Sequence, residues 1–84
     1  MKIYELTPKY DSRASFYGKA KVIVTNGSLA LFSYDTKVCT IESGKVKVYG
    51  EYSQTTMRHI KEFLLQSGSN AESKKQIIKD YMIK

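Results

Sequence analysis

The stretch YSQTTMRHIKEFLLQ, residues Tyr52–Gln66, is the clearest long periodic segment of the chain. Its apolar residues recur at the spacing of one helix face, which predicts an amphipathic helix. This apolar face consists of Met57, Ile60, Phe63 and Leu64. The start of this helix has three hydroxyl residues that can accept from the free amides of the first turn, Ser53, Thr55 and Thr56. Gly68 favours the end of the helix, since a left-handed residue costs little there.

The polar residues of this helix are expected on the opposite side. They are Arg58, Lys61, Glu62 and Gln66. Arg58 and Glu62 are four residues apart, which predicts an ion pair on the helix surface. His59 is expected on the flank of the helix, at the boundary of the core.

The first half of the chain has the pattern of an antiparallel sheet. Asn26-Gly27 is a strong hairpin signal. In the segment KVKVY, valine alternates with polar residues, which predicts one dry and one wet face. The expected strands are 2–6, 20–25, 28–34, 38–42 and 45–49. Residues 9–18 are expected to form either a short helix or an ordered loop.

A second helix is expected over residues 71–83, because Ser69 and Glu72 have the spacing of a capping box. The predicted fold class is therefore α+β. It consists of a four- or five-stranded antiparallel meander followed by two C-terminal helices packed on one face. A chain of 84 residues predicts a single domain, 1–84, that is β-rich over 1–50 and helical over 53–83.

The net charge of +6 favours an anionic partner, either nucleic acid or an acidic protein surface. An ordinary lysine-rich surface explains the same charge. No apolar run is long enough to cross a membrane, and the start of the chain does not resemble a signal peptide. A single cysteine, Cys39, fits a reducing cytosol. We therefore expect a cytoplasmic protein without a membrane partner.

Catalytic and metal sites have little support in the residue pattern. One His and one Cys are too few for a structural zinc site. Cys39 and His59 form a conceivable nucleophilic pair, but the position of Cys39 within a strand favours an inert buried thiol. The five glycines are dispersed and form no phosphate-binding loop. The chain is therefore not expected to be an enzyme or to bind a cofactor or metal.

The function is therefore expected to depend on residues at the surface. Five residues are expected on one face of the sheet: Lys19, Lys21, Lys45, Lys47 and Tyr49. Lysines interleaved with tyrosines suit single-stranded nucleic acid, whereas a solvated sheet face is also commonly rich in lysine. Tyrosines are also enriched in protein interfaces, where they act as exposed anchors. The candidate partner-binding residues are Lys45, Lys47, Tyr49, Arg58 and Lys61.

Three blocks of the chain resemble a family of short, uncharacterised proteins from phages and prophages of Gram-positive bacteria. They are YDSRASFYGKA (10–20), LFSYDTKV (31–38) and YSQTTMRHIKEFLLQ (52–66). The most specific element is TT-x-RHIKEFL, residues 55–64. The resemblance implies no catalytic residues.

The resemblance implies a role in a mobile element. Small non-enzymatic phage proteins often bind a host machine and block it, and an anti-CRISPR inhibitor of a Cas effector is one concrete version. The expected partner is a host protein or nucleoprotein complex, in the cytoplasm of the bacterial host. The alternative is a nucleic-acid-binding module that uses the basic sheet face. A homodimer is compatible with both.

Overall fold

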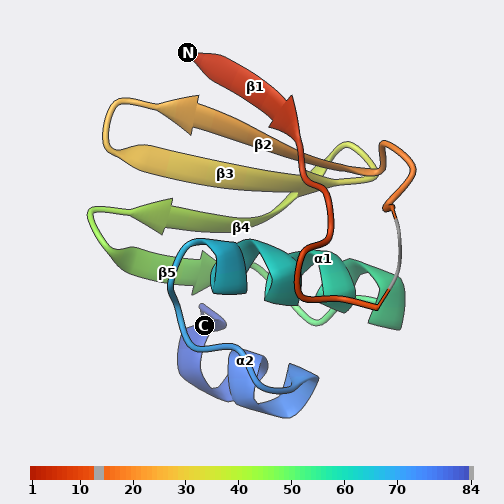
Figure 1. Ribbon diagram of the computed structural model, residues 1–84. Coiled ribbons are helices and arrows are strands. Elements are labelled where there is room, and N and C mark those ends of the chain that lie inside the picture. Colours follow the sequence, from red (N-terminus) through yellow and green to blue (C-terminus); the bar gives the residue numbers. More distant parts are fainter. Residues whose placement is uncertain (13–14, 84) are drawn as a thin grey trace.

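Five antiparallel strands lie side by side in chain order, and two helices follow them (Figure 1). The computed structural model describes residues 1–12 and 15–83. The strands are β1 (Lys2–Glu5), β2 (Ala20–Thr25), β3 (Ser28–Ser33), β4 (Thr36–Glu42) and β5 (Lys45–Val48). The helices are α1 (Gln54–Gln66) and α2 (Lys74–Tyr81). The predicted α+β meander with two C-terminal helices is confirmed, and its sheet has five strands.

One face of the sheet forms the core, because its apolar residues lie opposite one another across the strands. Val22 lies opposite Leu31, Leu31 opposite Cys39, and Cys39 opposite Val48. All four side chains are fully buried. Figure 1 shows α1 lying along the sheet, and its apolar residues share the core with this row. Alternate residues of each strand point to the other face.

A β-bulge in β4 decides which residues of that strand reach each face. The register shifts so that Leu31 lies opposite Cys39 while Phe32 lies opposite Lys37. Val38 is the extra residue, and both Val38 and Cys39 are buried. The bulge therefore adds an apolar residue to the core and leaves Lys37 beside Phe32 on the other face.

The three turns that connect β2 through β5 are short, whereas a long loop connects β1 to β2. The predicted hairpin turn at Asn26-Gly27 is confirmed, and Gly27 has a φ of 75°. The turn between β3 and β4 has positive φ at two residues that are not glycine, Tyr34 (51°) and Asp35 (68°). Such turns match the twist of a hairpin, but each non-glycine residue there costs about 1–3 kcal/mol.

Helix α1 begins and ends as its sequence predicts. The Ser53 hydroxyl accepts from the backbone N–H of Thr56 at 3.4 Å. After the last turn, Gly68 has a φ of 83° and the backbone N–H of Ser69 donates to the Leu64 carbonyl. The predicted apolar face is confirmed, since all four of its residues are buried: Met57, Ile60, Phe63 and Leu64.

Helix α2 begins three residues later than the sequence predicts. Its N-terminal cap is Ser73, whose hydroxyl accepts from the backbone N–H of Gln76 at 3.2 Å. The prediction of a helix over 71–83 capped by Ser69 is therefore wrong at its start. The physical reason is burial of Ala71, which holds the chain against the core before the helix begins. Ser73 and Gln76 have the same S-x-x-Q spacing as a capping box.

The two edges of the sheet differ. At the β5 edge, the backbone N–H of Ile83 donates to the Val48 carbonyl at 2.9 Å, and Val48 and Met82 form a parallel bridge. Helix α2 lies beside this edge (Figure 1), and its Ile77 belongs to the common core. Strand β1 forms the opposite edge, far from α2 (Figure 1).

Candidate functional site

The face of the sheet turned away from α1 carries four lysines, and we call it the open face. Cross-strand pairing defines its rows. Ile3, Ile23, Ala30, Thr40 and Lys47 form one row. Glu5, Lys21, Phe32 and Lys37 form the next row toward the β3–β4 turn. Thr25, Ser28, Glu42 and Lys45 form the row on its other side. The expectation that Lys21, Lys45 and Lys47 share one sheet face is confirmed.

Tyr49 joins this face immediately after β5. Its hydroxyl lies 3.0 Å from Thr40 Oγ1, so the ring is held across the sheet. Lys37 Nζ lies 5.6 Å from the centroid of the same ring, within the range of a cation–π interaction. Lys37 itself lies opposite the half-buried Phe32. Lys37 therefore lies next to the Tyr49 ring and across the strand from Phe32 on the open face.

Carboxylates partly balance the lysines of the open face. Glu42 lies opposite Lys45, and Glu5 lies opposite Lys21. The Glu5 carboxylate, however, accepts from the backbone N–H of Gly18 at 3.1 Å. Lys47 lies opposite Thr40, which is uncharged. The two lysines of this face that have no carboxylate across the strand, Lys37 and Lys47, lie on β4 and β5.

Lys19 lies at the end of the open face, next to the β3–β4 turn. Its Nζ lies 5.1 Å from the centroid of the Tyr34 ring. A shallow hollow of about 210 Å³ connects this pair to Lys21 and Phe32. Lys19 thus extends the line of lysines toward an exposed tyrosine.

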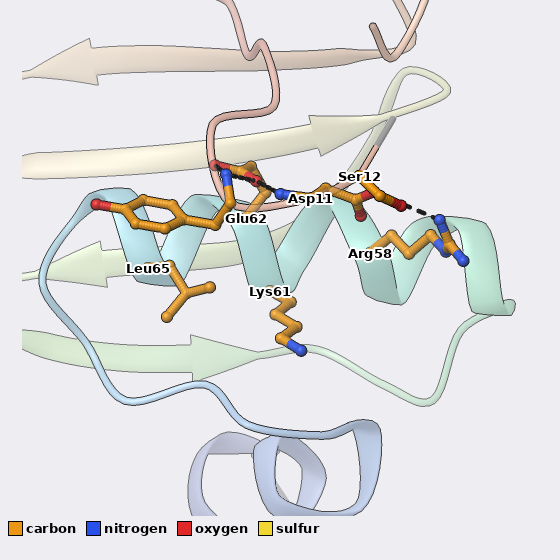
Figure 2. Close-up of a pocket in the computed structure, with 7 residues that line it drawn as sticks. Asp11, Ser12, Arg58, Lys61, Glu62 and Leu65 are labelled. Carbon is orange, nitrogen blue, oxygen red and sulfur yellow. Dashed lines mark hydrogen bonds and ion pairs between the residues drawn. The ribbon is translucent and has the colours of Figure 1, made fainter. Parts of the chain in front are cut away.

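Arg58 and Lys61 lie on α1 and therefore on the opposite side of the sheet from Lys45 and Lys47. They line a hollow of about 260 Å³ together with Tyr10 and Leu65 (Figure 2). Figure 2 shows the Lys61 side chain pointing away from the Glu62 side chain. The structure does not bring the five candidate contact residues together: Lys45, Lys47 and Tyr49 form one group, and Arg58 and Lys61 another.

The predicted ion pair between Arg58 and Glu62 is wrong. Arg58 Nη1 instead lies 3.4 Å from Asp11 Oδ1 (Figure 2). Glu62 is 1% exposed, so its placement on the polar side of the helix is also wrong. Glu62 lies within the predicted helix, but its burial does not follow from the helical spacing, because the loop after β1 covers it.

Glu62 anchors that loop. Its carboxylate accepts from the backbone N–H groups of Lys9 and Tyr10 at 3.0 Å and of Asp11 at 2.9 Å. Gln66 Nε2 bridges the same carboxylate and the Thr7 carbonyl. The described part of residues 9–18 is an ordered loop rather than a helix, and residues 13–14 lie outside the described range.

His59 is 1% exposed and lies in the core, so the prediction of a boundary histidine is wrong. Its Nδ1 lies 2.8 Å from Ser33 Oγ, which lies 3.1 Å from Thr56 Oγ1. The ring also packs on Phe16, with 4.6 Å between the ring centroids. A Ser–His contact of this length occurs in nucleophilic sites, but Ser33 is 2% exposed. The geometry favours a buried polar connection between β3 and α1.

Cys39 is buried, as its sequence position predicts. Burial raises the pKa of Cys39 to about 12. Burial, followed by the nearby Cys39 and Tyr49, also raises the pKa of Tyr52. Within residues 1–12 and 15–83, no three His, Cys, Asp or Glu side chains are grouped to hold a metal ion. No helix in the same ranges is long and apolar enough to span a membrane.

Besides Tyr4 in β1, three exposed tyrosines lie at two hollows. Tyr10 lies over the hollow on α1, while Tyr17 and Tyr34 line a hollow of about 200 Å³ above His59. All three rings are exposed, and Tyr49 and Tyr52 are half-buried. Tyr17 has a φ of 55°, a conformation uncommon for a bulky residue. Sequence reasoning identified these rings as a group but gave no sign of which would be exposed.

One comparison places the chain in a family. The model of a family of unknown function, DUF8033, matches residues 4–79. The chain belongs to this family. The match begins within β1 and ends within α2, so it includes the open face and both candidate contact groups. The family region thus continues past residue 66, where the third sequence block ends. Neither the curated proteins nor the solved structures include a match to the chain.

Proposed function

We propose that this chain is a non-catalytic binding protein that uses the open face of its sheet to contact the nucleic acid of its partner. The observation that carries the proposal is the grouping of Lys37, Lys47 and Tyr49 on a face that neither helix covers. Lysine amines attract phosphates, and aromatic rings offer surfaces on which bases stack. The net charge of +6 also favours binding to an anionic partner.

The resemblance of the sequence blocks favours a phage or prophage of a Gram-positive bacterium as the source. In that setting, the proposed function is inhibition of a host defence system, with a CRISPR–Cas effector as its target. Such an effector is a nucleoprotein, and a basic inhibitor can contact its guide RNA rather than imitate DNA. The protein would then act in the cytoplasm of the bacterial host.

Affinity capture from a host strain tests this proposal. The tagged chain is expected to recover a defence nucleoprotein, and RNase treatment is expected to reduce the recovery. Recovery of nucleic acid without any protein partner would contradict the inhibitor proposal and favour the second candidate below. Recovery that RNase leaves unchanged would contradict the contact with RNA.

The second candidate is a module that binds free single-stranded nucleic acid. The position of Phe32 beside Lys37, and of Tyr49 beneath it, favours this candidate. Gel shifts with single-stranded RNA and DNA across a salt series test it directly. Binding should weaken as salt rises, because phosphate contacts release counterions. Absence of binding even at low salt would contradict it.

The buried environment of Ser33 and His59 supports a function without catalysis, because a substrate cannot reach a pair that is 2% and 1% exposed. Arg58 and Lys61 face the other side of the sheet, so one flat partner would not contact them together with Lys45 and Lys47. They remain predicted contact residues for a partner that binds along α1.

A further inference from the structure

In the part of the chain that the structure describes, strand β1 pairs only with β2, so its other hydrogen-bonding edge is uncovered. All four of its residues are exposed. Ile3 is 56% exposed and Tyr4 is 40% exposed, although both side chains are large and apolar. An exposed edge strand presents free N–H and C=O groups and is a ready template for another strand.

The backbone geometry identifies which of these groups are free. The backbone N–H of Leu6 donates to the Ala20 carbonyl, and β1 pairs antiparallel with β2 without a register shift. Hydrogen-bonded residues alternate along an antiparallel strand. Tyr4 and Lys2 therefore bond to β2 as Leu6 does, and the backbone groups of Ile3 and Glu5 point outward.

The opposite edge of the sheet is covered at its Val48 end. There the Val48 carbonyl accepts from the Ile83 backbone, and α2 packs against β5. Proteins usually protect an edge with a proline, a bulge or a covering element. Strand β1 has none of these within Lys2–Glu5, and its protection consists of its short length and the charges of Lys2 and Glu5.

We propose that the β1 edge pairs with the β1 edge of a second copy of this chain. The two strands run antiparallel about a two-fold axis perpendicular to the sheet, which keeps like faces together. Ile3 of each copy then lies opposite Ile3 of the other on the open face, and the two residues exchange both backbone hydrogen bonds. On the core face, Lys2 of one copy lies opposite Tyr4 of the other, which permits a cation–π contact.

The symmetry explains why assembly stops at two copies. Isologous pairing uses the same edge of both copies. The resulting ten-stranded sheet ends on both sides at a β5 edge, which α2 and the C-terminal residues cover. Growth into a fibre would have to use this partly covered edge, which makes it unfavourable. The open faces of the two copies become continuous, but this dimer does not depend on the proposed function.

A proline substitution tests the proposal sharply. The N–H of Ile3 points outward, so Ile3→Pro removes no hydrogen bond from the single chain, and proline is tolerated at such edge positions. It removes one donor per copy from the proposed interface. Light scattering coupled to size exclusion, over a concentration series, is expected to show a dimer for the natural chain. Ile3→Pro should raise the dissociation constant of the dimer roughly tenfold to a hundredfold.

Ile3→Lys is a second variant that keeps the backbone intact, and it should also favour the monomer. Tyr17→Ala removes a large side chain that is even more exposed but lies away from β1, and it should leave the dimer unchanged. Circular dichroism confirms that each variant is folded. A natural chain that stays monomeric at all concentrations, or a dimer that Ile3→Pro and Ile3→Lys leave unchanged, would overturn the proposal.

Disulfide cross-linking tests the register. Directly opposite hydrogen-bonded residues are about 5.5 Å apart at Cα, within reach of a disulfide. Ile3→Cys is therefore expected to form a covalent dimer on mild oxidation. Tyr4→Cys is the matched control, because its counterpart lies diagonally across, about 7–8 Å away. Equal cross-linking of the two variants, or none, would contradict the axis through Ile3.

Discussion

Glu62 Oε1 accepts a hydrogen bond of 3.0 Å from the backbone N–H of Tyr10, which joins the middle of α1 to the loop after β1. The two residues are 52 positions apart in the chain. The same carboxylate also takes the N–H groups of Lys9 and Asp11. One side chain thereby satisfies three consecutive amides, and the loop needs no secondary structure of its own.

Glu62→Ala should destabilise the domain by about 2–4 kcal/mol, because it leaves these amides without their acceptor. Lys61→Ala is the matched control, since the adjacent Lys61 is exposed and should change the free energy of unfolding by less than about 0.5 kcal/mol. Urea denaturation of both variants measures the difference. Equal stability of the two variants would show that Glu62 does not anchor the loop.

Ser33→Ala should cost about 1–3 kcal/mol, because it removes the hydroxyl that lies 2.8 Å from His59 Nδ1 inside the core. Ser28→Ala serves as the control. The Ser28 hydroxyl lies 2.6 Å from Thr25 Oγ1 in an exposed turn, where water can replace it. In thermal or chemical unfolding, Ser33→Ala should therefore be clearly less stable than Ser28→Ala. The reverse order of stability would contradict a structural role for the Ser33–His59 contact.

The stability of the domain should fall in alkaline solution because of Cys39. Burial raises the pKa of its thiol to about 12, whereas an unfolded chain has a cysteine pKa of about 8.5. Between these values the unfolded state loses the proton and the folded state keeps it. The free energy of unfolding should therefore decrease as pH rises, by up to about 1.4 kcal/mol per pH unit.

Unfolding measured from pH 8 to pH 11 checks this slope, and Cys39→Ala provides the comparison. The variant lacks the thiol, so its free energy of unfolding should depend less steeply on pH. Identical slopes would contradict the burial of Cys39. Thiol-specific reagents at pH 8 should likewise modify the folded chain slowly and the unfolded chain rapidly.

Ser73→Ala should destabilise the domain by about 1 kcal/mol, because Ser73 caps α2. Ser69→Ala should have a smaller effect, although the sequence pattern favours Ser69 as the cap. Denaturation curves of the two variants show which serine caps the helix. A larger loss of stability in Ser69→Ala would contradict Ser73 as the cap and support the helix start that the capping-box spacing predicts.

Local patterns predict most of this fold. The turn at Asn26-Gly27 and the apolar face of α1 follow from the properties of short segments. The start of α2 does not, because two overlapping cap signals are present and burial of Ala71 decides between them. That burial depends on contacts with residues distant in the chain.

The candidate site is also predictable from short sequence patterns only in part. Strict alternation in β5 places Lys45 and Lys47 on one face, and the sheet register confirms it. The partners of Glu62 and His59 were not predictable, since they lie in a loop and in a strand far away in the sequence. The bulge in β4 also has no sequence signal, and it determines that Lys37 lies beside Tyr49.

Fluorescence anisotropy of a labelled single-stranded RNA measures whether the open face binds nucleic acid. The double variant Lys45→Gln/Lys47→Gln is compared with Lys74→Gln/Lys75→Gln, which removes the same charge from α2. The sheet variant should flatten the dependence of log K on log salt by about 1.4, since each phosphate contact on a single strand contributes about 0.7. The α2 variant should retain the natural slope. Equal slopes for both variants, or no RNA binding by the natural chain at low salt, would contradict the account.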